Sequence, residues 1–193
     1  DPRTRPQIMR IISGTLRGRK LAEVPHGGVR PTPDRVREAL FNILGQNLAE
    51  MDFLDLFAGT GAVGLEAASR GARGVVLVDH DPAACETCQA NVAHLGVGDR
   101  VTVTRGDVLA TIPALGAREA PFDLVFADPP YSQQPPELGR LLESVESSGL
   151  LAGGGTLVLQ VRRGREIPNE TALMENRARH YGITSILLYD RPT

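Results

Sequence analysis

Several residue types are scarce in this chain of 193 residues, and each scarcity narrows what the protein can be. Trp is absent, and the only two cysteines, Cys85 and Cys88, stand three residues apart in one expected helix. No second cysteine pair or histidine cluster accompanies them, so we predict no zinc site and interpret both as reduced structural thiols. The four histidines are scattered along the sequence, and we expect no metal centre.

Long apolar runs are missing as well. No stretch approaches the roughly 18 apolar residues that a membrane helix needs. The arginine-bearing start, DPRTRPQIMR, has no hydrophobic region typical of a signal peptide. We therefore expect a cytoplasmic protein without a membrane association, and the 41% of hydrophobic and 23% of charged residues suit a globular domain.

The charges are sorted by region. The net charge is −2, yet residues 1–37 carry nine Arg or Lys against three acids, whereas the remainder carries twelve against twenty. A basic segment can bind the phosphates of a nucleic acid, because each neutralised phosphate releases condensed counterions. A solvated terminal extension is the alternative that charge alone leaves open. The candidate nucleic-acid-binding residues here are Arg10, Arg17, Arg19, Lys20, Arg30 and Arg37.

Apolar runs alternate with helical patterns after about residue 50. Nearly apolar strands separated by helices indicate a mostly parallel sheet that is covered on both faces. The predicted fold class is α/β, a Rossmann-like doubly wound sheet whose ligands bind at the carboxyl ends of the strands. The predicted strands are 53–57, 74–79, 100–107, 122–128 and 155–162, the helices are 62–71, 82–96, 108–115 and 137–151, and two β-prone runs within 177–191 pivot near Gly182.

The first fifty residues follow another pattern. A small hairpin is predicted within 10–24, and a helix from about Asp34, where Val36, Leu40 and Ile43 fall on one face. We divide the chain into a flexible leader (1–8), a basic hairpin and helix (9–50) and a ligand-binding α/β domain (51–193).

A glycine-rich turn follows the first strand of the α/β domain, in DLFAGTGAVGLEA (55–67). Gly59 and Gly61 allow a positive φ and a close approach of a ligand, and the following helix begins with free amides. The spacing GTGAVG also fits the dinucleotide pattern, so a nicotinamide cofactor has to be considered. Asp55 would repel a pyrophosphate but would attract a cationic amino-acid group, which favours S-adenosylmethionine.

Acidic residues end the next two strands. Asp79 comes twenty residues after Gly59, where an acid can hold the hydroxyls of a ribose. Asp107 can accept from the exocyclic amine of an adenine. The predicted cofactor site therefore comprises Asp55, Phe57, Ala58, Gly59, Thr60, Gly61, Asp79, His80, Asp107 and Val108.

The motif DPPY (128–131) follows the apolar run FDLVFA. Two prolines end the strand and stiffen the turn. Asp128 and the carbonyl of Pro129 could accept from the two N–H groups of a base amine, and Tyr131 could stack on the base. We predict that Asp128, Pro129, Pro130 and Tyr131 form the catalytic corner. The alternative for the motif alone is a proline turn capped by an aspartate.

These motifs in succession resemble those of class I S-adenosylmethionine-dependent methyltransferases that modify exocyclic amines of bases. MRIISGTLRGRKL (9–21) with RPTPDRVREALFNIL (30–44) resembles more narrowly the bacterial RsmD family, the 16S rRNA guanine-N2-methyltransferases. The resemblance implies a seven-stranded sheet ending in an antiparallel hairpin, S-adenosylmethionine over Gly59–Gly61, and a target guanine at Asp128–Tyr131. It also implies a grip on rRNA by the basic arm.

Other functions stay open at this point. An adenine-N6 DNA methyltransferase would use DPPY in the same way, although the chain has no room for a separate target-recognition region. A non-catalytic RNA-binding assembly factor is the alternative from another class, and a nicotinamide-dependent oxidoreductase is the third. For the leading hypothesis we expect 16S rRNA, within the 30S subunit or its assembly intermediate, as the partner of a monomeric enzyme.

Overall fold

The computed structural model describes residues 8–25, 32–117, 120–168 and 171–193. The predicted leader (1–8) and Arg30 therefore lie outside the described residues, apart from Ile8. In chain order the elements are α1 (Asp34–Leu44), β1 (Asp52–Leu56), α2 (Ala62–Ser69), β2 (Gly74–Asp79), α3 (Pro82–Leu95), β3 (Val101–Arg105), α4 (Val108–Gly116), β4 (Phe122–Ala127), α5 (Pro135–Ser147), β5 (Leu151–Arg162), β6 (Met174–Tyr181) and β7 (Thr184–Asp190).

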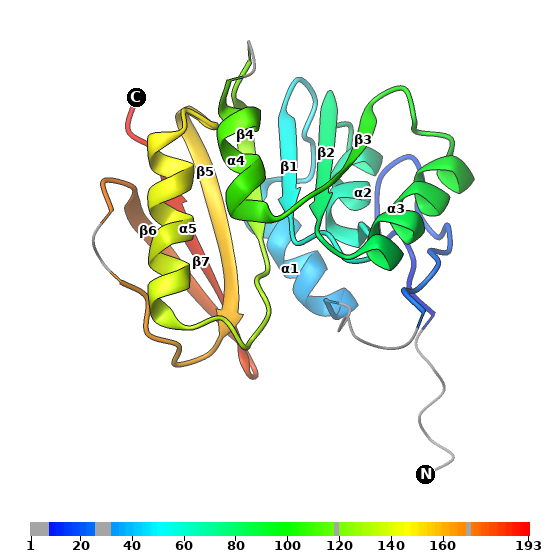
Figure 1. The fold of residues 1–193 in the computed structure, drawn as a ribbon. Helices are drawn as coiled ribbons and strands as arrows, with labels where there is room; N and C mark the ends of the chain where they lie inside the picture. The colour runs from blue at the N-terminus through cyan, green and yellow to red at the C-terminus, as the bar shows by residue number, and fades with distance from the viewer. Residues whose placement is uncertain (1–7, 26–31, 118–119, 169–170) are drawn as a thin grey trace.

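The strands form one seven-stranded sheet in the order β3-β2-β1-β4-β5-β7-β6 (Figure 1). The first five strands are parallel, and β7 and β6 pair antiparallel beyond β5. The Rossmann-like fold with a C-terminal antiparallel hairpin is thereby confirmed. The strand order reverses between β1 and β4, and an open α/β sheet binds its ligand beside such a switch point.

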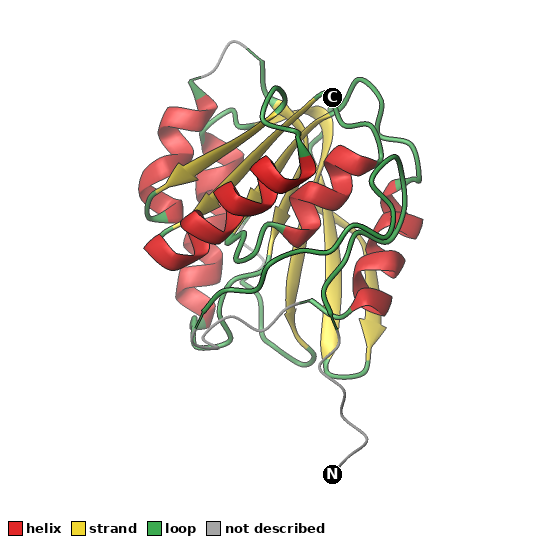
Figure 2. Ribbon diagram, turned by 90° about the vertical axis from the view of Figure 1, so that its right-hand side faces the viewer, coloured by secondary structure: helices red, strands yellow, loops and turns green. Residues whose placement is uncertain are grey.

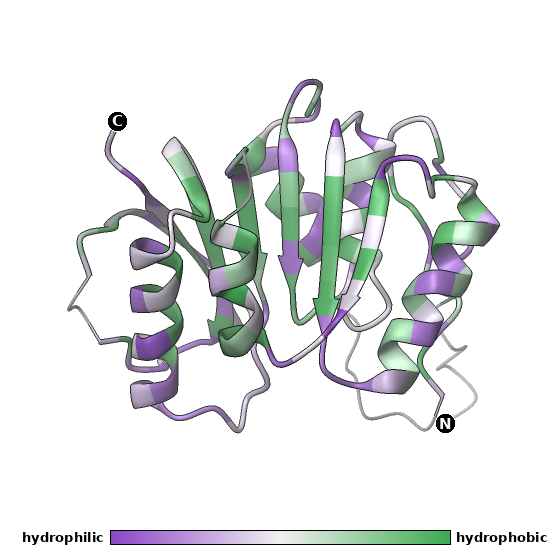
Figure 3. Cartoon of the chain, turned by 45° about the horizontal axis from the view of Figure 1, so that its top comes forward, coloured by the Kyte–Doolittle hydropathy of each residue, from purple (hydrophilic) through white to green (hydrophobic). Residues whose placement is uncertain are grey.

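Helices cover both faces of the sheet (Figure 2). Buried residues of α1, α2 and α3 share one apolar cluster with one face of the sheet, and those of α4 and α5 share a second cluster with the other face. The central strands are correspondingly hydrophobic along most of their length (Figure 3). Burial on both faces explains why these strands read as nearly continuous apolar runs in the sequence.

The N-terminal segment lies against α2. Its predicted hairpin is short, with one antiparallel bridge between Arg10 and Lys20. Gly14 has φ +82°, and a Cβ there would collide with the main chain of Ser69, so only glycine permits this approach. Met9, Ile11 and the buried side chains of α1 belong to the same apolar cluster as α2 and α3, which means that residues 9–50 share a core with the α/β domain.

Two predicted elements had wrong boundaries. The helix predicted at 137–151 begins at Pro135, because a proline fits the first turn of a helix and Gln134 N donates to Glu137 Oε2 (2.6 Å). It ends before Gly149, which has φ +75°. β5 begins at Leu151 rather than at 155, since the glycine-rich start LAGGG continues as a strand through a register shift against β4.

Candidate active site

The glycine turn leaves β1 in a backbone conformation that side chains rarely adopt. Phe57 has φ +63°, Gly59 +58° and Gly61 +79°. A positive φ is uncommon for a residue with a side chain, and such strain is concentrated at functional sites. The turn delivers the chain into α2, for which Gly61 is the N-cap residue.

The third glycine of the motif serves packing rather than the turn. A Cβ on Gly64 would overlap the Leu77 side chain and approach Val75. The absence of a side chain lets α2 lie close against β1 and β2, which is one recognised role of a glycine at this position.

Asp79, at the carboxyl end of β2, holds the glycine turn from the side. Its Oδ2 accepts from Gly59 N (2.8 Å) and its Oδ1 from Asp81 N (3.0 Å). Nδ1 of the neighbouring His80 lies 3.4 Å from Asp79 Oδ1, and the His80 side chain is largely exposed. Asp79 therefore fixes the loop geometry, and each of its oxygens has a further lone pair for a ligand hydroxyl.

Asp55 is buried beneath the start of α2. Its Oδ2 accepts from Gly64 N (2.9 Å), whereas Oδ1 is buried and, among the described residues, has no hydrogen-bonding partner. The pKa of Asp55 is raised to about 8, chiefly by burial; the hydrogen bond from the Gly64 amide lowers it in part, and the charges of Asp128 and Asp79 add to the rise. A buried acceptor without a partner is costly, and a cationic group at Oδ1 would remove that cost.

Carbonyl groups of the glycine turn are held from α3. Cys88 Sγ donates to Gly59 O (3.2 Å), and Asn91 Nδ2 donates to Thr60 O (2.9 Å). Thr60 itself donates through Oγ1 to Met9 Sδ (3.2 Å). Both cysteines are free and buried, as the sequence predicted, and Cys88 braces the loop.

Asp107 and Val108 begin α4 at the carboxyl edge of β3. Asp107 is exposed and caps the helix, since its Oδ1 accepts from Ala110 N (2.9 Å), and Val108 is buried. Gly106 N donates to Asp79 O (2.9 Å), which joins this strand end to the previous one. The predicted cofactor residues thus occupy three adjacent strand ends.

Asp128 follows β4, the strand next to β1. Thr32 Oγ1 makes a long hydrogen bond to its Oδ2 (3.5 Å), and Gln160 Nε2 donates to the same oxygen (3.0 Å). Among the described residues, no hydrogen bond reaches Oδ1. Burial raises the pKa of Asp128 to about 7, and the hydrogen bonds from Thr32 and Gln160 oppose this rise.

The rest of the corner opens outward. Pro129 is buried, whereas Pro130 is exposed and Tyr131 is 38% exposed. Arg165 Nη2 donates to the carbonyl oxygen of Tyr131. A rigid turn with an accessible phenol ring is the arrangement expected for a platform beside Asp128.

Two residues of this corner escaped the sequence analysis. Gln160 on β5 is 4% exposed, and its Oε1 is buried without a partner among the described residues. Its signal was a lone polar residue in the apolar run LVLQV. Thr32 lies within the RPTPDRVRE motif, but nothing in that motif indicates a contact with residue 128.

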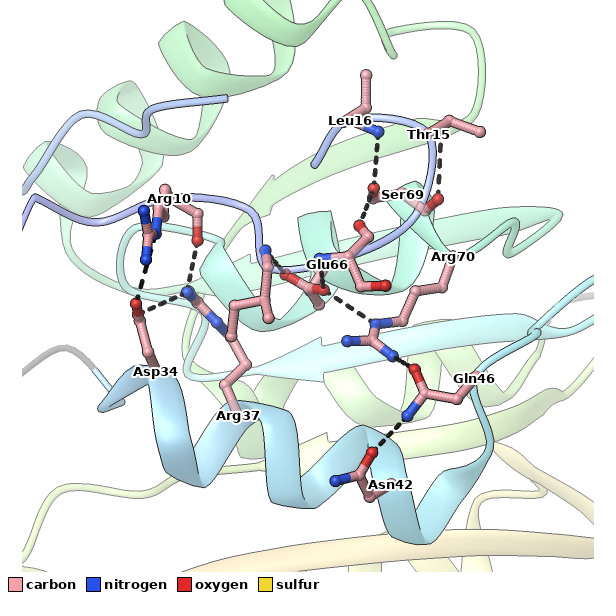
Figure 4. A network of polar contacts seen from close by, with 12 residues as sticks. Arg10, Thr15, Leu16, Asp34, Arg37, Asn42, Gln46, Glu66, Ser69 and Arg70 are labelled. Atoms are coloured by element: carbon pink, nitrogen blue, oxygen red, sulfur yellow. Dashed lines mark hydrogen bonds and ion pairs between the residues drawn. The ribbon is translucent and has the colours of Figure 1, made fainter. Parts of the chain in front are cut away.

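One predicted RNA contact is contradicted. Arg37 has 0% exposure, and its Nη2 donates to Arg10 O (2.6 Å) and Asp34 Oδ1 (3.0 Å) (Figure 4). Its charge serves the junction between α1 and the N-terminal segment, so it does not reach a nucleic acid. Sequence reasoning counted Arg37 as part of the arm because its helical position gave no sign that it faces the core.

The same network attaches the arm to α2 (Figure 4). Glu66 is fully buried and accepts from Ile12 N (2.8 Å), Ser13 N (2.9 Å) and Arg70 Nε (2.9 Å). Ser69 Oγ donates to Ser13 O (2.5 Å) and accepts from Leu16 N (3.0 Å). The arm is therefore an integral, fixed part of this face.

The other described arm cations, Arg10, Arg17, Arg19 and Lys20, are exposed. Arg19 Nη2 donates to His94 O (2.7 Å), near the end of α3. Helices that return between parallel strands end at the amino edge of the sheet, so Arg17 and Arg19 lie nearer to that edge than to Asp128. The side chains brought beside Asp128 come instead from Thr32, β5 and its following turn.

Neither a metal cluster nor a membrane helix is found in the described part of the chain. No three His, Cys, Asp or Glu side chains there could hold a metal ion together. The helices there are all too short or too polar to span a bilayer.

The sheet order, the glycine turn and the acids at successive strand ends define a Rossmann-like methyltransferase fold. Residues 9–190 match the model of the protein family described as "Conserved hypothetical protein 95". The chain belongs to this family, and the resemblance to RsmD proteins is thereby confirmed.

Individual relatives agree over nearly the whole chain. The Ribosomal RNA small subunit methyltransferase D of Escherichia coli K12 is 35% identical over 187 residues, which are 95% of this chain and 90% of that protein. A hypothetical protein of Thermus thermophilus has a solved structure with a TM-score of 0.81 and 35% identity, covering 96% of this chain and 100% of its own. An RNA methyltransferase of Salinibacter ruber, solved with S-adenosyl-L-homocysteine, shares the fold at 21% identity, with a TM-score of 0.62 and coverage of 84% and 94%.

Proposed function

We propose that the protein transfers a methyl group from S-adenosylmethionine to the exocyclic N2 amine of a guanine in small-subunit rRNA. The observation that carries the proposal is the position of Asp128, whose Oδ1 has no hydrogen-bonding partner among the described residues and which stands at the strand end next to the glycine turn. The name of the 35% identical Escherichia coli relative supports an rRNA substrate.

The residues at the glycine turn fit S-adenosylmethionine. When bound, this cofactor supplies an electrophilic methyl group. The Oδ1 of Asp55, which has no hydrogen-bonding partner among the described residues, suits its cationic amine. Asp79 would hold the ribose hydroxyls, and Asp107 with Val108 would contact the adenine, while the remaining predicted residues, Phe57, Ala58, Thr60 and His80, line the same loop.

The catalytic corner would make the base amine nucleophilic. The lone pair of an exocyclic amine is delocalised into the ring, and it becomes available when both N–H groups donate to fixed acceptors. Asp128 supplies one acceptor, and the carbonyl of Pro129, whose direction is set by two locked imino rings, supplies another. Tyr131 would stack on the base, so that positioning provides most of the rate enhancement.

The exposed arm residues Arg10, Arg17, Arg19 and Lys20 would contact rRNA, with Arg17 and Arg19 at a distance from the reacting base. In this scheme the substrate is 16S rRNA in the 30S subunit or its assembly intermediate, in the bacterial cytoplasm, and the enzyme acts as a monomer.

The test is incubation with tritiated S-adenosylmethionine and 30S subunits from cells that lack the activity, in parallel with the deproteinised rRNA. Nucleoside analysis should place the label in N2-methylguanosine. Label in N6-methyladenosine, or no transfer to either substrate, would refute the proposal.

A further inference from the structure

A second basic cluster follows the strand that carries Gln160. Arg162 ends β5, and Arg163 and Arg165 follow across Gly164, which has φ +79° and turns the chain. Sequence analysis assigned the basic character to residues 1–37 and did not single out this RRGR stretch. Its three arginines stand at the carboxyl edge of the sheet, the edge that also presents Asp128.

Direct contacts join this cluster to the catalytic corner. Arg165 donates through Nη2 to the carbonyl oxygen of Tyr131. Arg162 and Arg165 also line one small pocket together with Pro129, Pro130 and Tyr131. A nucleotide held at the corner would therefore have these guanidinium groups as immediate neighbours.

In the described part of the chain, no acid pairs with the arginines of this cluster. Arg162 and Arg163 are exposed, and no ion pair among the described residues includes Arg162, Arg163 or Arg165. By contrast, Arg10, Arg37, Arg70 and Arg73 each pair with an acid. An uncompensated group of arginines is suited to phosphate, which a guanidinium can bind through two parallel hydrogen bonds.

Exposed apolar side chains flank the same cluster. Only three large hydrophobic residues of the described chain are exposed, and two of them are Tyr131 (38%) and Ile183 (61%). Ile183 lies in the turn between β6 and β7, where its carbonyl accepts from Arg163 N (2.7 Å). Cations beside an accessible aromatic ring are typical of surfaces that bind unpaired nucleotides by phosphate contacts and stacking.

We propose that Arg162, Arg163 and Arg165 form a second RNA-binding surface that holds the phosphates next to the target nucleotide. The choice of RNA as the partner rests on the proposed function, because methyl transfer requires the RNA strand to pass the corner that these arginines adjoin. Arg17 and Arg19 of the arm then bind a more distant part of the RNA, and the cluster positions the strand at the reacting base.

The experiment measures binding of deproteinised 16S rRNA to full-length protein between about 50 and 300 mM salt. The double variant Arg162→Ala/Arg163→Ala should lower the slope of log affinity against log salt by about 1.5 units, at roughly 0.7–0.9 for each lost phosphate contact. Arg162→Lys/Arg163→Lys should keep most of the slope, because the charges remain. Thermal melting verifies that each variant is folded.

Arg73→Ala is the control variant. The Arg73 side chain is 53% exposed, and it lies beside the start of β2, at the edge of the sheet opposite to the arginine cluster. Its slope should equal that of the wild type. If the alanine double variant also binds like the wild type, or if its loss is matched by Arg73→Ala, the proposed surface is wrong, and an acidic protein partner becomes the better explanation of the cluster. The product analysis described above is independent of these slopes, so a failure of the guanine assignment would be seen separately.

Discussion

The two halves of the candidate site are built differently. Around the glycine turn, buried acids and α3 side chains bind main-chain amides and carbonyls, as in the bonds from Gly59 N to Asp79 and from Asn91 to Thr60 O. Around Asp128, side chains from distant segments meet, namely Thr32, Gln160 and the Arg165 group that holds Tyr131 O. The cofactor half is therefore built mostly from the consecutive elements β1 to α4, whereas the base half joins Asp128 to a segment as distant in the chain as Thr32.

The largest effect is expected for the centre of the base half. Asp128→Ala should lower methyl transfer by on the order of a hundredfold or more, because it removes an oriented acceptor for the amine. Asp128→Asn, which keeps one oxygen acceptor, should lose less. Single-turnover rates at saturating S-adenosylmethionine measure both, and a wild-type rate for the alanine variant would exclude a catalytic role.

In the cofactor half, Asp79→Ala should raise the dissociation constant of S-adenosylmethionine by about tenfold or more, since a hydrogen bond to a charged group contributes roughly 1.5–3 kcal/mol. Both the ribose contact and the brace on Gly59 N would be lost. Calorimetry gives the constant, and Asp99→Ala, which removes an exposed acid in the turn before β3, is the charge-matched control. An unchanged constant would contradict the assignment of Asp79.

The pH dependence of the methyl-transfer rate distinguishes the base half from the cofactor half. Asp128 has a pKa of about 7 because burial disfavours its charged form, and the ionised carboxylate is a stronger acceptor for the amine N–H than the protonated carboxyl group. The transfer rate at saturating cofactor should therefore rise with pH through about 7. Gln160→Leu removes a hydrogen bond that lowers this pKa, so the midpoint should move to higher pH.

A shift in the midpoint of the pH profile would not result if Gln160→Leu only weakened the packing around the site. The comparison requires saturating S-adenosylmethionine, because Asp55, with a pKa of about 8, titrates in the cofactor half. A Gln160→Leu variant with the wild-type midpoint and a uniformly lower rate would mean that Gln160 does not act through Asp128.

Substitution of Arg37 should have the smallest effect on RNA binding, although Arg37 is charged. Arg37→Ala should lower the free energy of unfolding by about 2 kcal/mol, because the partly buried hydrogen bonds to Arg10 O and Asp34 are lost. The salt dependence of RNA binding should stay as in the wild type. Urea unfolding and the slope measurement check the two parts, and a reduced slope in folded protein would restore Arg37 to the RNA interface.

The difference between the halves also explains why the sequence predicted the cofactor half better than the base half. The sheet was predictable because its strands are buried on both faces and therefore apolar, and the cofactor half because one motif, residues 55–67, contains the strand end, the turn and the helix start. The packing of Gly64 and the brace from Asp79 involve β2, the next strand along the chain, so the motif indicates where the turn lies but not these contacts.

The base half was predicted only at DPPY. The contacts of Asp128 with Thr32 and Gln160 span 96 and 32 positions in the chain, and no local pattern indicates such pairings. Arg37 was misassigned for the same reason, since the face of α1 that carries it is buried by the distant N-terminal segment, to which it donates at Arg10 O. The RRGR stretch was overlooked because its meaning comes from its position beside Tyr131.

The most direct test puts two variants side by side, with cofactor affinity and single-turnover methyl transfer to 30S subunits measured for each. We predict that Asp128→Ala binds S-adenosylmethionine like the wild type and transfers almost no methyl group, whereas Asp79→Ala binds it weakly and recovers transfer when the cofactor is raised to saturation. If Asp128→Ala instead loses cofactor binding and transfers normally once saturated, the carboxylate does not belong to the base-activating half and the account is wrong.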